Sequence, residues 1–128
     1  MFNKTGITKV SGAAPTQILY NVQNQMSVGI KLAKGFAGAV EENGRKIVKA
    51  GTPLTGDLAN RSVAFTAASN NAVGVLLHDV DVTTSDANCT LLIWGFVNLD
   101  RVDANTKAKL TAEIKTSLAG KVYFLSDN

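Results

Sequence analysis

Two long apolar segments in the second half of the chain constrain its fold more than any other feature. They cover residues 72–82 and 90–102, and the residues between them, TTSDANC, favour a loop because Ser, Asp and Asn are turn formers. As strands, both segments are apolar at odd and at even positions, so both faces of each strand must be covered. In so small a domain, the cover must come from a helix on one side or from a neighbouring subunit.

Length and composition also favour a neighbouring subunit as the cover for part of the apolar surface. The chain has 128 residues, which fits one domain, and 45% of them are hydrophobic while only 18% are charged. Apolar surface in excess of what one small subunit can bury is commonly hidden between subunits, so we expect an oligomer. The single cysteine, Cys89, excludes an internal disulfide.

The rest of the sequence predicts a β-rich α+β domain with an N-terminal arm. Residues 1–25 mix polar residues with Gly and Pro and show no apolar period, which is typical of an extended arm that orders on a partner. Alternation over residues 27–33 predicts a strand, and Asn43-Gly44 predicts a hairpin with a type I′ turn. Residues 50–57, AGTPLTGD, are typical of a structural loop with Leu54 turned inward. We therefore divide the chain into an arm, 1–25, and one β-rich domain, 26–128.

One short helix is expected near the C-terminus. Asp103 is a suitable N-cap, Leu110, Ile114 and Leu118 recur every four residues, and Gly120 provides a stop. A closing strand is expected at residues 123–125. This helix is the one candidate within the chain for covering a face of the apolar strands.

The charge distribution argues against a nucleic-acid partner, and the lack of a long apolar run argues against a membrane partner. The net charge is +3, and residues 1–40 contribute +4 because they contain four lysines and no acid. Nucleic-acid binders cluster more Lys and Arg and interleave aromatics, and neither pattern is present. There is no secretory leader and no run of eighteen apolar residues, so we expect a protein that is made in the cytoplasm.

The residues that could carry chemistry do not form a recognisable constellation. Cys89 and His78 are the only possible thiol–base pair, and Cys at a strand edge is usually inert. Asp79, Asp81 and Asp86 lack the spacing of a calcium loop and are expected to be solvated charges. We therefore expect no cofactor, no metal and no enzymatic activity. Trp94 and Phe96 could stack a ligand or belong to the core.

Three segments carry a resemblance to a known family. The series AGTPL-x-GD (50–57), AVGVLLHDVDV (72–82) and LLIWGFVNLDRV (91–102), followed by a short Lys-bearing helix, resembles the small capsid decoration and head-fibre base proteins of tailed bacteriophages over residues 48–125. The resemblance implies a compact β-clip-like subunit that trimerises on an assembled capsid and strengthens the shell. It also implies that the N-terminal segment ties the subunit to the major capsid protein. The chain ends at Asn128 without a fibre domain, so host attachment is not implied.

The sequence therefore predicts a homotrimeric decoration protein on the outer surface of a virion. Lys4 and Lys9 of the arm are expected to grip the major capsid protein. The predicted subunit interface consists of Val75, Leu77, Trp94, Phe96 and Val97. The alternative is a small ligand-binding module, for carbohydrate as one example, with Trp94 and Asp81 as contacts, and a third hypothesis is an enzyme that depends on Cys89.

Overall fold

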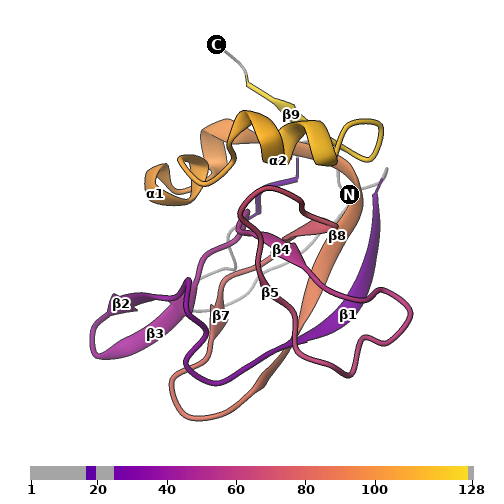
Figure 1. The fold of residues 1–128 in the computed structure, drawn as a ribbon. Helices are drawn as coiled ribbons and strands as arrows, with labels where there is room; N and C mark the ends of the chain where they lie inside the picture. The colour runs from indigo at the N-terminus through magenta and orange to yellow at the C-terminus, as the bar shows by residue number, and fades with distance from the viewer. Residues whose placement is uncertain (1–16, 20–24, 127–128) are drawn as a thin grey trace, which may run out of the picture.

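The computed structural model describes residues 17–19 and 25–126, which form a mostly β-stranded body with two short helices on one side (Figure 1). The strands are Met26–Leu32 (β1), Val40–Glu42 (β2), Arg45–Val48 (β3), Pro53–Thr55 (β4), Thr66–Ala67 (β5), Gly74–Leu76 (β6), Val80–Asp81 (β7), Ala87–Asn98 (β8) and Val122–Leu125 (β9). The helices are Ala104–Lys107 (α1) and Ala112–Ser117 (α2), after a 3₁₀ turn at Leu99–Arg101 (η1). This arrangement confirms the β-rich α+β class.

The strands form two sheets. The larger sheet has the order β1-β8-β6-β4-β5, with antiparallel neighbours, and β9 adds to β8 in parallel. The smaller sheet has the order β2-β3-β7. The second apolar segment is thus mainly the 12-residue strand β8, which pairs with β1, β6 and β9 and forms the centre of the fold.

The first apolar segment is divided between the two sheets. β6 pairs with β8 in the larger sheet, whereas β7 pairs with β3 in the smaller one. Between them, the carboxylate of Asp79 accepts a hydrogen bond from the backbone N–H of Ala50 at 2.8 Å. This bond lies where the chain passes from the larger sheet to the smaller one, and residues 72–82 do not form one continuous strand.

The apolar residues form two cores, one on each side of the larger sheet. The first core, which we call the helix-side core, includes Val75, Leu92 and Val97 together with Ile114 and Leu118 from the α2 region. The second, the inner core, includes Ile30, Leu32, Phe65, Leu76 and Leu91. A parallel bridge between Leu32 and Phe65 links β1 to the chain just before β5, so the two ends of the strand order approach each other around the inner core.

A β-bulge in β8 decides which side chains reach which core. Met26 pairs with Trp94 but the next residue, Ser27, pairs with Leu92, so Ile93 is an extra residue on β8. Without the bulge, Leu92 and Val97 would lie on opposite faces, since they are five positions apart. With it, both belong to the helix-side core, and Trp94 and Phe96 face the other way. Strict alternation along β8 would place Val97 on the face of Leu91 and Ile93, and Trp94 and Phe96 on the face of Leu92, and the bulge overturns both groupings.

The expected single helix is two helices. α1 ends at Lys107, and a second N-cap, Thr111, accepts a hydrogen bond from the backbone N–H of Ile114 at 3.3 Å and starts α2. Asp103 caps α1, as predicted, and Leu110, Ile114 and Leu118 are buried. The predicted apolar period is thus correct, while the break at residues 108–111 was not visible in it. Residues 50–57 likewise contain the short strand β4 where the sequence predicted only a loop, although Leu54 is fully buried as expected.

The hairpin at Asn43-Gly44 is confirmed. Val40 pairs with Ile47, and the two turn residues have φ values of 53° and 78°. Both values lie in the left-handed region that a type I′ turn requires.

We expect Gly44→Ala to lower the free energy of unfolding by about 1 kcal/mol, because an L-residue is strained at positive φ. An added Cβ at Gly44 meets no atom within 4 Å, so the whole effect would come from the backbone. Gly29→Ala is the matched control, since its added Cβ also meets nothing within 4 Å and its φ is not positive. Urea unfolding of the two variants makes the comparison, and equal stability would contradict the assigned turn.

Candidate interaction surface

Four exposed apolar side chains and the half-buried Phe96 lie together at one end of β8 and its neighbours, and we call these five residues the aromatic strip. Trp94, Tyr123, Met26 and Leu125 have exposed fractions of 40%, 43%, 59% and 37%, and Phe96 is half-buried between them. The Trp94 and Phe96 rings meet edge-on with centroids 5.9 Å apart, and Phe96 stacks on Tyr123 at 5.4 Å. The strip is therefore an ordered apolar surface rather than scattered exposed residues.

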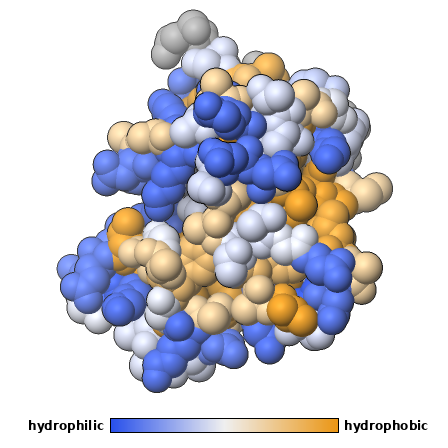
Figure 2. Space-filling view, in the orientation of Figure 1, coloured by the Kyte–Doolittle hydropathy of each residue, from blue (hydrophilic) through white to orange (hydrophobic). Residues whose placement is uncertain are grey.

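Strand register explains why these residues share a face. Phe96 pairs with Tyr123 across the parallel β8–β9 ladder, and Met26 pairs with Trp94 across the β1–β8 ladder. Paired residues point to the same side of a sheet, as do residues two apart on one strand. Figure 2 shows apolar surface over this part of β1 and β8, bordered by polar areas.

Three of the five predicted interface residues do not belong to this surface. Val75 and Val97 are fully buried and Leu77 is 5% exposed, all in the helix-side core of the same chain. The prediction was wrong for them because the helices cover that face of the sheet. Trp94 and Phe96 do lie on the surface, and Tyr123, Leu125 and Met26 join them. Sequence alternation pointed to Tyr123 only as part of a closing strand, and Met26 carried no signal at all.

Of the predicted arm, residues 1–25, the structure describes residues 17–19 and 25. Lys4 and Lys9 lie outside the described residues. Ile18 is fully buried and Leu19 is 5% exposed, both in the helix-side core, and the backbone N–H of Asn98 donates to the carbonyl of Ile18 at 2.8 Å. Leu19 also forms a bridge with Val97. Two residues of the expected arm are therefore part of the body.

Cys89 lies in β8 opposite Ile30 and is half-buried against the inner core. Desolvation raises the pKa of its thiol to about 11. Nδ1 of His78 is buried and has no hydrogen-bond partner among the residues that the structure describes. The thiol is therefore held in its protonated form, which is the opposite of what a nucleophilic cysteine requires.

We expect Cys89 in the native protein to react with a disulfide reagent at neutral pH roughly a hundredfold or more slowly than in the unfolded chain. The rate should rise with pH until the thiol ionises near its pKa of about 11. Absorbance at the wavelength of the released thiolate gives both rates. Fast labelling of the native protein at neutral pH would favour the hypothesis of a cysteine-dependent enzyme.

The three central aspartates hold the backbone in separate places. Asp79 accepts from Ala50, and Asp86 accepts from the backbone N–H of Lys34 at 2.9 Å. Asp81 accepts from the hydroxyl and the backbone N–H of Thr83 and pairs with Arg45. These hydrogen bonds, Thr83 first, lower the pKa of Asp81 to about 2. Within residues 17–19 and 25–126, no group of three or more His, Cys, Asp or Glu side chains could hold a metal ion.

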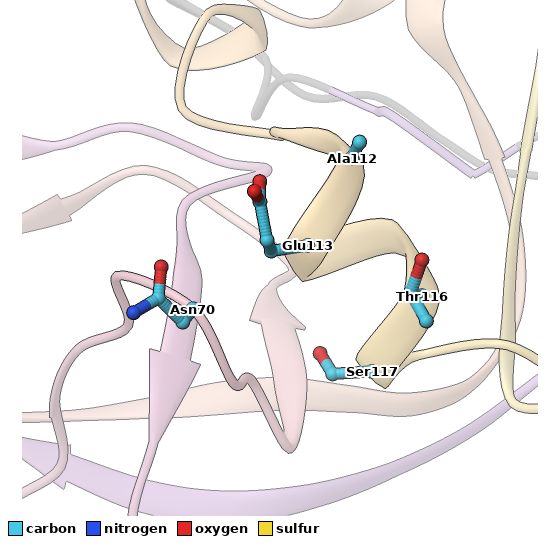
Figure 3. Close-up of a pocket in the computed structure, with 5 residues that line it drawn as sticks. All are labelled: Asn70, Ala112, Glu113, Thr116 and Ser117. Atoms are coloured by element: carbon cyan, nitrogen blue, oxygen red, sulfur yellow. The ribbon is translucent and has the colours of Figure 1, made fainter.

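Two surface hollows are lined in part by side chains that make structural hydrogen bonds or ion pairs. The larger, of about 390 Å³, lies between Asn70 and the α2 residues Ala112, Glu113, Thr116 and Ser117 (Figure 3). The Ser117 hydroxyl bonds the backbone of Ala72 and the carbonyl of Ile114, so it ties α2 to the sheet.

The second hollow, of about 200 Å³, is lined by Lys49, Ala50, Asp79, Arg101 and Asp103. There, Nζ of Lys49 lies 2.6 Å from Glu42 and 3.7 Å from Asp79, and the bond to Glu42 is the main reason why the pKa of Lys49 is raised. Asp103 caps α1. The charges of this hollow thus connect the β2–β3 hairpin, the turn after β6 and α1.

The fold and its surface define a small β-rich protein with an exposed aromatic strip. The chain matches no protein-family model, and no curated protein is significantly similar to it in sequence. No helix in the described part of the chain is long and apolar enough to cross a membrane.

Proposed function

We propose that this chain is a structural protein that binds the outside of an assembled phage capsid as a homotrimer and strengthens the shell. In this proposal its body has a β-clip-like arrangement. The segment before Gln17, with Lys4 and Lys9, binds the major capsid protein. The resemblance of residues 48–125 to phage decoration and head-fibre base proteins is one support, and the β-rich body is compatible with it.

The aromatic strip is the observation that carries the proposal. Both faces of the larger sheet are otherwise covered by the chain itself, so the strip is the part of the apolar segments that remains to be buried. Aromatic residues and methionine are enriched in the buried centres of protein–protein contacts. A second copy of the chain is the partner that would be present wherever the protein is made.

Sedimentation velocity of the full chain at micromolar concentration tests the proposal. We expect a trimer, and we expect Trp94→Asp to yield monomers because a charge would be buried in the contact. Asn88→Asp is the matched control, since Asn88 is an exposed residue near the other end of the same strand. A monomeric full-length chain would overturn the proposal.

Capsid binding is the second test. Co-sedimentation with expanded capsids of the phage that encodes the chain compares the full chain with one that begins at Gln17. This boundary preserves the buried residues Ile18 and Leu19, which removal of residues 1–25 would delete. We expect the shortened chain to lose binding, and equal binding would exclude the arm as the capsid contact.

The exposed aromatic rings support the carbohydrate-binding alternative, whereas the position of Asp81 argues against it. Exposed Trp94 and Tyr123 rings are the kind of surface on which sugars stack. Asp81, however, lies in the smaller sheet and is engaged by Thr83 and Arg45. A change of Trp94 fluorescence on titration with sugars, in a chain that sediments as a monomer, would favour this alternative.

A further inference from the structure

A second exposed apolar feature lies away from the aromatic strip, in the loop between β4 and β5. Leu58 is 41% and Val63 is 58% exposed, and Arg61 lies between them in sequence. We call residues 57–64 the apolar loop. In Figure 1 it projects at the right of the view, whereas β9 lies at the top.

Hydrogen bonds within the loop order its backbone around Leu58 and Val63. The carboxylate of Asp57 accepts from the backbone N–H of Ala59 at 2.9 Å, and the carbonyl of Asp57 accepts from Asn60 N–H at 3.1 Å. The hydroxyl of Ser62 donates to the Asn60 side chain at 2.8 Å. A loop that is ordered before binding loses less conformational entropy when it binds.

The base of the loop is fixed by Phe65. Its side chain is 1% exposed, and its backbone N–H donates to the carbonyl of Lys31 at 2.8 Å. Gly56 lies so close to the ring that an added Cβ would be only 2.6 Å from it. The loop is thus anchored at its base and presents two apolar side chains and a cation to solvent.

The aromatic strip and the apolar loop share no residue and belong to different elements of the larger sheet. The loop joins β4 to β5 at one end of the strand order, and the strip includes β9, which pairs only with β8 among the described strands. A closed ring of three copies requires two different surfaces per copy, because a surface that binds itself generates a two-fold dimer. The chain has two such surfaces.

We propose that the apolar loop of one copy binds the aromatic strip of the next copy, head to tail. Leu58 and Val63 would pack on the Trp94 and Tyr123 rings, and the Arg61 guanidinium would lie against an aromatic face, where a cation is attracted. This inference rests on the trimer of the proposed function and names the partner surface of the strip.

Complementation between two defective variants tests the head-to-tail contact. We expect Leu58→Asp and Trp94→Asp each to sediment as monomers. Mixed in equal amounts at high concentration, they should form dimers, because the intact loop of the Trp94 variant fits the intact strip of the Leu58 variant. Circular dichroism verifies that each exposed-site variant is folded.

Disulfide cross-linking detects the contact between the apolar loop and the aromatic strip even if a single such contact between two copies is weak. In a Cys89→Ala background, the variant with Leu58→Cys and Tyr123→Cys should form disulfide-linked trimers on mild oxidation. Each single-cysteine variant can form at most dimers and serves as the control. A contact of strip against strip would instead give efficient dimers of the Tyr123→Cys variant alone.

The outcomes separate this inference from the proposed function. If Leu58→Asp assembles like the full chain, or if the mixture and the double-cysteine variant yield no joined copies, the loop is not the partner surface although the trimer stands. If the full chain itself is a monomer, both proposals fail.

Discussion

Phe65→Ala is expected to lower the free energy of unfolding by about 3–5 kcal/mol, the usual cost of removing a buried phenylalanine. The ring is 1% exposed in the inner core, and Leu32 forms a bridge with this residue that joins β1 to the start of β5. Loss of the ring would leave a cavity at the place where the two ends of the strand order meet. Urea unfolding followed by Trp94 fluorescence measures the change.

Thr66→Ala is the control for this prediction, because Thr66 is exposed and lies next in the chain. Substitutions at exposed positions usually change stability by no more than about 0.5 kcal/mol. A loss of similar size in both variants would contradict the role of Phe65 in closing the sheet around the inner core. The Phe65 variant would also loosen the apolar loop, so its assembly should weaken along with its stability.

The sequence predicted the elements that depend on local chemistry. The turn at Asn43-Gly44 needs positive φ at both residues, and these two residue types tolerate it, so the hairpin could be located to the residue. The strand predicted at residues 27–33, which is observed at 26–32, and the buried face of Leu110, Ile114 and Leu118 follow from simple periods. The class of the fold therefore follows from residue types and their spacing alone.

Long-range pairing decided what the sequence could not predict. The bulge at Ile93 shifts the register in which β8 pairs with β1. Gly95 interrupts the apolar segment and suggests a bulge nearby, but the residue types do not locate the extra residue at Ile93. The bulge reverses the face of every later residue in β8, so Val97 lies in the helix-side core with Leu92 and not in the inner core with Leu91. The closure of the sheet by Phe65 is likewise a contact between residues 33 positions apart.

The candidate surface likewise depends partly on local residue patterns and partly on long-range strand pairing. Trp94 and Phe96 were predicted as interface residues because the apolar segment had two faces to cover, and they are exposed or half-buried. Met26 and Tyr123 reach the same surface only through pairing with β8. Val63, together with Phe65, suggests a short strand, and Leu58 carries no signal of its own, so the sequence does not predict an exposed apolar loop at these residues.

Ile18→Ala is expected to lower the free energy of unfolding by about 2–5 kcal/mol. Its side chain is fully buried in the helix-side core, beside Val97 and Val122 in the same cluster, although it falls within a segment whose composition predicts an arm. A surface arm would tolerate this substitution without effect. Thermal and urea unfolding of the variant therefore determine where the body of the protein begins.

Lys9→Ala is the matched substitution in the segment that we propose as the capsid contact, and it should leave the free energy of unfolding unchanged while weakening co-sedimentation with capsids. Ile18→Ala should lower the free energy of unfolding and leave capsid binding unchanged at temperatures where the variant stays folded, because its side chain is fully buried in the helix-side core. If Ile18→Ala unfolds like the unmodified chain, the contacts of residues 17–19 with β8 contribute nothing to stability, and the arm extends to residue 25 as the composition indicated. Opposite responses of the two variants would divide the N-terminal segment into a part that binds the shell and a part that completes the core.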